Sequence, residues 1–335
     1  MELEDERVPL VLYLRDFANK GVQNNIGKKV IDLIPGWNKV FGFVAIDASL
    51  EDLKEVIEAL EALLEDDKCC ENPAHKAAEI GALKLLQIFL HEGLIDFNTT
   101  SGSNKETPLH VACANGRTEI VKLIILASKE RGIDLNAKDK LFGQTPFLVA
   151  CYHGKTEIMK LFLDSSEEYD IDLTCSTNAL NLHKSAFHLA CKQEGTIEPV
   201  ELLINSSRRY KIDLNKTDFL GDTAFQEACD NTYFDENIEI VKLMLKSAKE
   251  YGIDLNRGNG DTGFHRAISK SNAELVKFMI ENHKEFGLDI TRKDEMGNTG
   301  LDLVKVEIET YGRMNFVEVK NMLELETKSN CCSIL

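Results

Sequence analysis

The sequence predicts an all-α fold in which short pairs of helices stack on one another along the chain. The main observation is a stretch that recurs at nearly fixed spacing, with openings at Thr107, Thr145, Ser185, Thr223, Thr262 and Thr299 that lie 38, 40, 38, 39 and 37 residues apart. Each copy contains two helical patterns separated by turn residues. One such unit cannot bury its own apolar faces, so the copies must pack against each other.

The first copy, Thr107 to Gly143, shows how the elements follow from the residues. Thr107 can cap a helix and Pro108 suits the first helical position, where no backbone donor is needed. Asn115-Gly116 should end this helix, because both residues tolerate a left-handed backbone. The next helix, Thr118–Arg131, is apolar over a broad face, as expected for burial on two sides. The residues that follow it predict a turn or hairpin.

The openings also share a motif, Thr-Pro-Leu-His-x-Ala, and its derivatives. This motif and period resemble the ankyrin repeat. The resemblance covers about residues 72 to 325 and implies a solenoid of helix pairs joined by hairpin fingers. It also implies that each motif histidine bonds to the opening Thr and to neighbouring backbone. The openings that carry the resemblance are Thr107-Pro108-Leu109-His110, Thr145-Pro146-Phe147, Ser185-Ala186-Phe187-His188, Thr223-Ala224-Phe225-Gln226 and Thr262-Gly263-Phe264-His265.

Several departures from the family pattern lead to specific expectations. The period exceeds the usual value of about 33 residues, and the extra residues fall where Gly132 and Gly252 would end an added helical turn. We expect that turn on the outer, convex face. The finger over 174–184 lacks the usual Asp and Gly and should be irregular. Gln226 replaces the motif histidine, which we expect to weaken local hydrogen bonding.

The chain is predicted to have three parts. Residues 1–68 form a helical N-terminal capping region, residues 69–325 form six to seven ankyrin repeats, and residues 326–335 form a tail. A cap is expected because the ends of a solenoid expose apolar surface. The alternative for residues 1–68 is a separate binding module, since Trp37, Phe41 and Phe43 cluster there.

Charge and cysteine usage narrow the class of protein. A formal net charge of −17 argues against binding to nucleic acid or to anionic lipid, and it favours a basic protein as the partner. It also contributes to solubility. Four cysteines follow an alanine at one position of the repeat, where a small buried side chain is needed. Because a full repeat separates each cysteine from the next, they lie beyond the reach of a disulfide bond. We infer a reducing compartment. The four repeated cysteines are Cys113, Cys151, Cys191 and Cys229.

No pattern in the chain indicates catalysis, a cofactor or a metal. A Gly-rich phosphate loop, a nucleophile elbow and a zinc-binding helix are all missing. Cys69-Cys70 with His75 and His91 fits no usual zinc spacing. An enzyme within the first 68 residues stays a third alternative, although that segment is short and shows no site.

The leading interpretation is a monomeric, non-enzymatic scaffold or adaptor that binds a protein partner on the concave surface of fingers and first helices. Apolar residues at the fingertips have no core to join and are the expected anchors. The alternative is that they pack on the next finger. The predicted partner-binding residues are Leu141, Phe142, Phe219, Leu220 and Met296.

The last residues resemble a prenylation box. Cys332 with Ser333, Ile334 and Leu335 fits the geranylgeranyl variant, and Cys331 could take a second lipid. The alternative is a frayed tail with incidental cysteines. We therefore expect a cytoplasmic protein, with peripheral attachment to the cytosolic face of a membrane if the tail is modified. A second interpretation is a secreted effector or membrane-targeted adaptor that acts on a host or organelle pathway.

Overall fold

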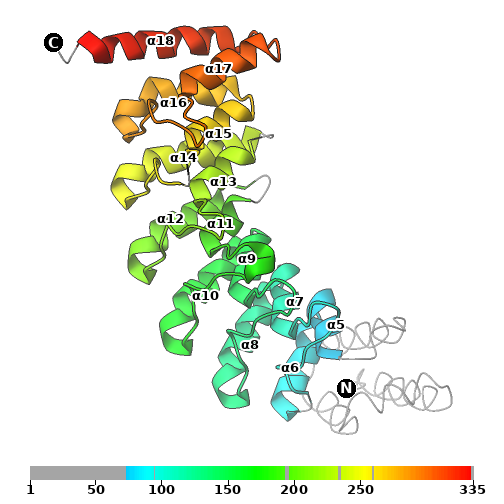
Figure 1. The fold of residues 1–335 in the computed structure, drawn as a ribbon. Coiled ribbons are helices and arrows are strands. Elements are labelled where there is room, and N and C mark those ends of the chain that lie inside the picture. Colours follow the sequence, from blue (N-terminus) through cyan, green and yellow to red (C-terminus); the bar gives the residue numbers. More distant parts are fainter. Residues whose placement is uncertain (1–72, 94, 193–195, 233–234, 259, 333–335) are drawn as a thin grey trace, which may run out of the picture. The chain divides into compact units, whose positions relative to one another are not determined.

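The computed structural model describes residues 73–93, 95–192, 196–232, 235–258 and 260–332 (Figure 1). Within these ranges it contains fourteen α-helices in seven consecutive pairs and one 3-10 helix, η2 (Ala179–Asn181). The all-α prediction is confirmed, because extended pairing in the described ranges is limited to isolated bridges. The helical cap predicted in residues 1–68 lies outside the described residues.

The chain divides into two compact units. Unit 1 comprises the residues up to Ala150 together with Lys160–Asp172, and unit 2 comprises Cys151–Met159 and Leu173–Leu335. The described pairs of unit 1 are α5 (Pro73–Ile80) with α6 (Leu83–Glu92) and α7 (Pro108–Ala114) with α8 (Thr118–Arg131). Helices α9 (Pro146–Tyr152) and α10 (Thr156–Tyr169) contribute residues to both units.

Unit 2 contains four complete pairs. They are α11 (Ala186–Cys191) with α12 (Glu198–Tyr210), α13 (Ala224–Asp230) with α14 (Asp235–Tyr251), α15 (Gly263–Ser269) with α16 (Ala273–Phe286), and α17 (Gly300–Glu309) with α18 (Phe316–Cys332).

Like helices stack on like helices within each unit. In unit 1, α5 packs on α7 and α6 on α8. In unit 2, the first helices contact in the order α11, α13, α15 and α17, and the second helices in the order α12, α14, α16 and α18 (Figure 1). Most of the largest fully buried side chains are phenylalanines of these helices. The core is therefore a continuous apolar layer between the helices within each unit, as expected for a repeat array.

Close packing explains why the opening motif changes along the chain. Gly263 occupies the first position of α15, where the first copy has a proline. A Cβ atom there would collide with the Phe225 ring and lie 3.1 Å from the Cys229 Sγ atom. At these two positions the Phe ring of one repeat fills the space that a Cβ atom would need at the start of the next, because Gly300 meets the Phe264 ring in the same way.

The added helical turn is confirmed. Helix α8 runs for 14 residues and ends at Gly132, which adopts a left-handed φ of 63°. Helix α14 ends likewise before Gly252, with φ of 72°. The helix α6 lacks this turn, because it runs for only 10 residues. Second helices therefore differ in length by about one turn inside unit 1.

Three motif histidines, His110, His188 and His265, form the network that the family resemblance implies, and His75, whose opening residue lies outside the described residues, makes the contact to the next finger, from Nε2 to the Glu106 carbonyl at 2.7 Å. The Nδ1 atom of His110 accepts from the backbone N–H of Thr107 at 3.2 Å and lies 2.7 Å from its hydroxyl. Its Nε2 atom lies 3.0 Å from the carbonyl of Gln144 in the next finger. Because Nδ1 accepts, Nε2 carries the proton and donates. His188 and His265 make the equivalent contacts to Ser185 and Asp222, and to Thr262 and Arg292.

The expectation that Gln226 weakens this network was wrong. Its Oε1 atom accepts from the Thr223 backbone N–H at 2.8 Å and from the Thr223 hydroxyl at 3.0 Å. Its Nε2 atom donates to the carbonyl of Asp261 in the next finger. A side-chain amide has one acceptor and one donor end, so it reproduces both roles of a neutral imidazole.

A finger is the segment between the second helix of one pair and the first helix of the next. Isolated antiparallel bridges, such as Thr217 with Thr223, close the fingers. The irregular finger predicted over 174–184 is confirmed, because it contains η2 and two residues with positive φ, Leu182 and His183.

Asparagines link successive fingers to each other. The Asn98 side chain donates to the Gly132 carbonyl at 2.8 Å and accepts from the Asp134 backbone N–H at 2.8 Å. We call this repeated arrangement the asparagine ladder. Asn136 makes the same two bonds in unit 1, to the Asp170 carbonyl and the Asp172 N–H. In unit 2, Asn215 bonds to the Gly252 carbonyl and the Asp254 N–H, and Asn256 bonds to the Gly287 carbonyl and the Asp289 N–H.

Candidate protein-binding surface

An aspartate shapes the tip of each of two well-formed fingers. The Asp139 carboxylate accepts from the backbone N–H of Phe142 at 2.6 Å and of Gln144 at 3.0 Å. In unit 2, Asp218 accepts from Leu220 at 2.8 Å and from Asp222 at 3.1 Å. These bonds fold the backbone back on itself and hold the residues between them at the tip.

The tips carry large apolar side chains that are exposed. The exposed fractions are 37% for Phe142 and 39% for Leu141, both in one finger of unit 1. In unit 2 they are 68% for Phe219, 53% for Leu220 and 85% for Met296. All five predicted residues thus lie at fingertips and are exposed, but the two units hold them on separate fingers. Their role in binding stays a prediction.

One tip residue was missed by the sequence reasoning. Leu180 lies in the irregular finger, within η2, and is 73% exposed. It falls 39 residues after Leu141 and 39 before Phe219, so alignment by the repeat period would have found it. Unit 2 therefore presents exposed apolar tips at Leu180, Phe219, Leu220 and Met296, which we call the unit 2 tips.

A backbone hydrogen bond joins two neighbouring tips of unit 2. The Phe219 N–H donates to the Leu182 carbonyl at 2.7 Å. The Phe219 ring also lies 6.0 Å, centroid to centroid, from the His183 ring of the preceding finger. The alternative that tips pack on adjacent fingers is thus partly correct for Phe219, although most of its side-chain surface stays exposed.

Charged side chains beside the unit 2 tips are paired within the chain. Lys184, which precedes the cap of α11, pairs with Glu227 on α13 and lies 3.8 Å from Asp218. One repeat later, Asp222 precedes the cap of α13 and pairs with Arg266 on α15 at 2.5 Å. These two pairs occupy equivalent positions with the signs reversed. Each pair links the helices of consecutive repeats.

Burial controls the titration of this network. Desolvation lowers the pKa of His110, His188 and His265, and the carbonyls that accept from them oppose the shift. These histidines are therefore neutral at pH 7. Burial also raises the pKa of the Cys113, Cys191 and Cys229 thiols, as expected for inert core cysteines. The prediction that the repeated cysteines are buried is confirmed, and Cys151 is buried as well.

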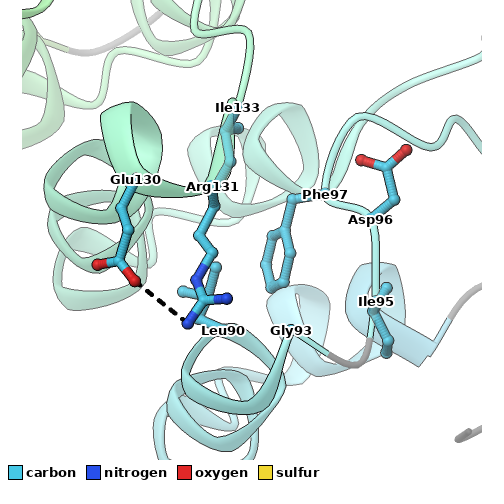
Figure 2. Close-up of a pocket in the computed structure, with 8 residues that line it drawn as sticks. All are labelled: Leu90, Gly93, Ile95, Asp96, Phe97, Glu130, Arg131 and Ile133. Atoms are coloured by element: carbon cyan, nitrogen blue, oxygen red, sulfur yellow. Dashed lines mark ion pairs between the residues drawn. The ribbon is translucent and has the colours of Figure 1, made fainter.

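A pocket of about 410 Å³ lies in unit 1, between the C-terminal ends of α6 and α8 (Figure 2). Leu90, Phe97 and Ile133 line it with buried apolar surface. Arg131 crosses its edge, donates to the His91 carbonyl at 2.6 Å and lies 3.4 Å from the Glu130 carboxylate.

The sequence analysis did not predict this pocket. The signal that could have revealed it is the spacing of the openings, because a degenerate copy of the opening motif, Asn72-Pro73-Ala74-His75, begins only 35 residues before Thr107. A shorter repeat predicts a shorter second helix, and therefore a gap beside the longer α8.

Other functional predictions concern residues at the edge of the described part. The main chain of Cys331 and Cys332 belongs to α18, and their side chains lie outside the described residues. The helices of the described ranges include none that is both long and apolar enough to cross a membrane. The same ranges contain no group of three His, Cys, Asp or Glu side chains that could hold a metal ion.

Comparison with known proteins identifies the family. The model for ankyrin repeats (3 copies) matches residues 46–139, 126–218 and 147–256, and the model for ankyrin repeats (many copies) matches residues 248–304. No curated protein matches the chain. The human ASB11 ankyrin repeat domain is 26% identical, with a TM-score of 0.53 over 70% of this chain and 91% of that domain.

The ankyrin repeat domain of Bcl-3, a member of the IkappaB protein family, is also similar in fold. It is 23% identical, with a TM-score of 0.54 over 70% of this chain and 93% of that domain. The family matches span more than half of the sequence, and the helix pairs, capping histidines and fingers agree with them. This chain belongs to the ankyrin-repeat family.

Proposed function

We propose that this protein is a non-enzymatic scaffold or adaptor that binds a protein partner through its fingertips. Ankyrin repeats are protein-interaction domains, and the observation that supports the fingertips is the exposure of large apolar side chains there. Phe219 and Met296 have no core to join, yet their backbones are held in defined turns. Exposed aromatic side chains on rigidly held loops are typical binding anchors.

The test compares fingertip variants with a control of the same chemistry. Affinity capture with the intact protein identifies a partner, and the dissociation constant of the purified partner is then measured. Phe219→Ala and Phe142→Ala should each weaken binding by about 1–3 kcal/mol. Leu126→Ala on α8 is the control, because Leu126 is exposed but lies on a second helix. Equal affinities for all three variants would remove the tips from the interface.

We also propose that the tail contributes to membrane attachment. The motif at Cys332 supports prenylation, and Cys331 offers a second lipid site, which matters because a single chain gives only marginal attachment. The residues upstream, Leu323 to Lys328, contain one lysine beside two glutamates, so a polybasic second signal is missing there. Cys332→Ser should make the protein soluble, and Cys331→Ser should only weaken attachment.

Intact-mass measurement of protein from eukaryotic cells tests the lipid directly. An added prenyl mass on the intact protein, lost in Cys332→Ser, is the expected result. An unmodified mass would leave a scaffold without a lipid anchor. The interpretation as a secreted effector depends on the same modification, since the lipid would direct the protein to a host or organelle membrane.

A further inference from the structure

The fingertips of unit 1 combine exposed apolar side chains with exposed lysines. Leu141 and Phe142 are exposed at the tip of the finger that precedes α9. Lys138 and Lys140 are exposed in the same finger, and Lys105 is exposed in the finger that precedes α7. We call these five residues the unit 1 fingertip surface.

A backbone hydrogen bond joins the two fingers close to their tips. The Lys140 N–H donates to the carbonyl of Asn104, the residue before Lys105, at 2.7 Å. The bonds from the Phe142 and Gln144 N–H groups to Asp139 then fix the second tip. The lysines of both fingers are therefore held near one another and can act on one bound segment.

The acidic side chains of these two fingers contribute little negative charge at the tips. Asp139 is buried, and its carboxylate accepts the backbone bonds that shape the tip. Glu106 is half-buried. Asp96 and Asp134 are exposed, but they lie at the start of each finger, where each accepts from the backbone N–H two residues further on. Three positive charges thus face solvent at the tips, against one half-buried negative charge.

The three lysines form no ion pair with another described residue. Exposed lysines on the second helices do pair, as Lys129 does with Glu168 at 3.9 Å and Lys284 with Glu326 at 2.8 Å. The fingertip lysines keep their charges available to a partner, in a chain whose formal net charge is −17.

We infer that the unit 1 fingertip surface binds a segment of a protein partner in which apolar side chains lie next to carboxylates. The inference rests on the proposed function of the fingertips and adds the chemistry of the segment that they bind. Leu141 and Phe142 would bury its apolar side chains, and the lysines would pair with its carboxylates. The charge of the whole chain favours a basic partner instead. Charges beyond about 8 Å are largely screened at physiological salt, however, so the charges at the contact decide the preference.

Two blocked tetrapeptides added to the full chain test this assignment. Glutamate-leucine-phenylalanine-glutamate and lysine-leucine-phenylalanine-lysine carry the same apolar side chains with opposite charges. With leucine methyl groups labelled for NMR, the acidic peptide should shift Leu141 saturably and leave Leu126, an exposed leucine of α8, unchanged. The basic peptide should bind about fivefold more weakly at low salt.

Paired variants isolate the contribution of the lysines. Lys138→Gln with Lys140→Gln should weaken binding of the acidic peptide about threefold and remove most of the preference. Lys246→Gln with Lys249→Gln removes two exposed lysines of α14 in unit 2. This control changes the net charge by the same amount and should leave both affinities unchanged.

Three results would overturn the inference. The first is no saturable shift of Leu141 with either peptide, and the second is equal or tighter binding of the basic peptide by the unaltered protein. The third is a set of NOE contacts to the Leu141 methyl groups from residues 47–67, which contain nine acids and one lysine. Those contacts would show that the chain's own segment occupies the surface.

Failure of this inference is distinguishable from failure of the proposed function. Weaker binding of the captured partner to Phe142→Ala, together with no charge preference between the peptides, would keep the fingertips as the interface and reject only the acidic segment. Unchanged binding of that partner to every fingertip variant would reject the proposed function itself.

Discussion

Removal of one asparagine from the ladder should destabilise unit 2 by a measurable amount. In unit 2, the Asn215 side chain donates to the Gly252 carbonyl at 2.7 Å and accepts from the Asp254 N–H at 2.7 Å. Asn215→Ala deletes both bonds. A typical hydrogen bond contributes about 0.5–1.5 kcal/mol net, so the pair contributes about 1–3 kcal/mol. Because Asn215 is half-exposed, water replaces part of the loss, and we expect about 1–2 kcal/mol.

Asn215→Asp tests the two hydrogen bonds separately, because it keeps the acceptor and replaces the donor. The carboxylate can still accept from Asp254, but its second oxygen faces the Gly252 carbonyl, which offers no proton. This repulsion favours the protonated acid, so the pKa of the new side chain should rise on folding. The variant should then lose stability as pH rises from the unfolded pKa of about 3.9 through the higher folded pKa. At low pH the protonated acid can donate to Gly252 and recover part of the loss.

Urea unfolding followed by circular dichroism at 222 nm measures these free energies, and hydrogen exchange at the Asp254 amide reports the bond directly. Asn321→Ala is the matched control, because Asn321 is exposed on α18. We expect less than about 0.5 kcal/mol for it. The reasoning is refuted if Asn215→Ala equals this control, or if exchange at Asp254 is unchanged.

Three further predictions concern the packing of the repeats. His188→Gln should keep both bonds, as Gln226 does, and remove a buried histidine. Burial lowers the pKa of His188 below its unfolded value, so the parent protein loses stability as pH falls below about 6.5, by up to about 1.4 kcal/mol per pH unit. Urea unfolding at pH 7 and at pH 5 should show a smaller loss of stability in the variant than in the parent. Lys184→Met leaves two acids unpaired and should cost about 3–5 kcal/mol in urea unfolding, with partial recovery in Lys184→Met/Glu227→Leu. Gly263→Ala should cost about 1–3 kcal/mol in thermal unfolding, and Phe225→Leu in the same chain should reduce that loss.

The repeated elements could be predicted from sequence because their causes are local. The cap at Thr107, the proline after it and the left-handed glycine at Gly132 each depend on the chemistry of one or two residues. The stacking then follows, since one helix pair cannot bury its own apolar faces. The irregular finger near Leu182 was also predicted, because the missing Asp and Gly remove the usual means of making the turn.

The errors and omissions have a different origin. Gln226 was expected to weaken the hydrogen bonds because it is not a histidine, whereas the network requires only an acceptor and a donor at the correct separation. The pocket near Ile133 depends on the relative lengths of two helices, which no single motif reveals. Exposure at Phe219 and Met296 followed from the repeat, whereas the contact between the Phe219 and His183 rings depends on the irregular shape of the preceding finger.

The reversed ion pairs of unit 2 have a consequence for how this array can change by recombination. Loss of one repeat, residues 185–222, would keep the period intact and join Lys184 directly to Thr223. The lysine would then face Arg266 in place of Glu227, and two positive charges would meet at a nearly buried position. Neighbouring repeats here are matched by charge to one another, so their order along the chain is fixed even though their backbones are interchangeable.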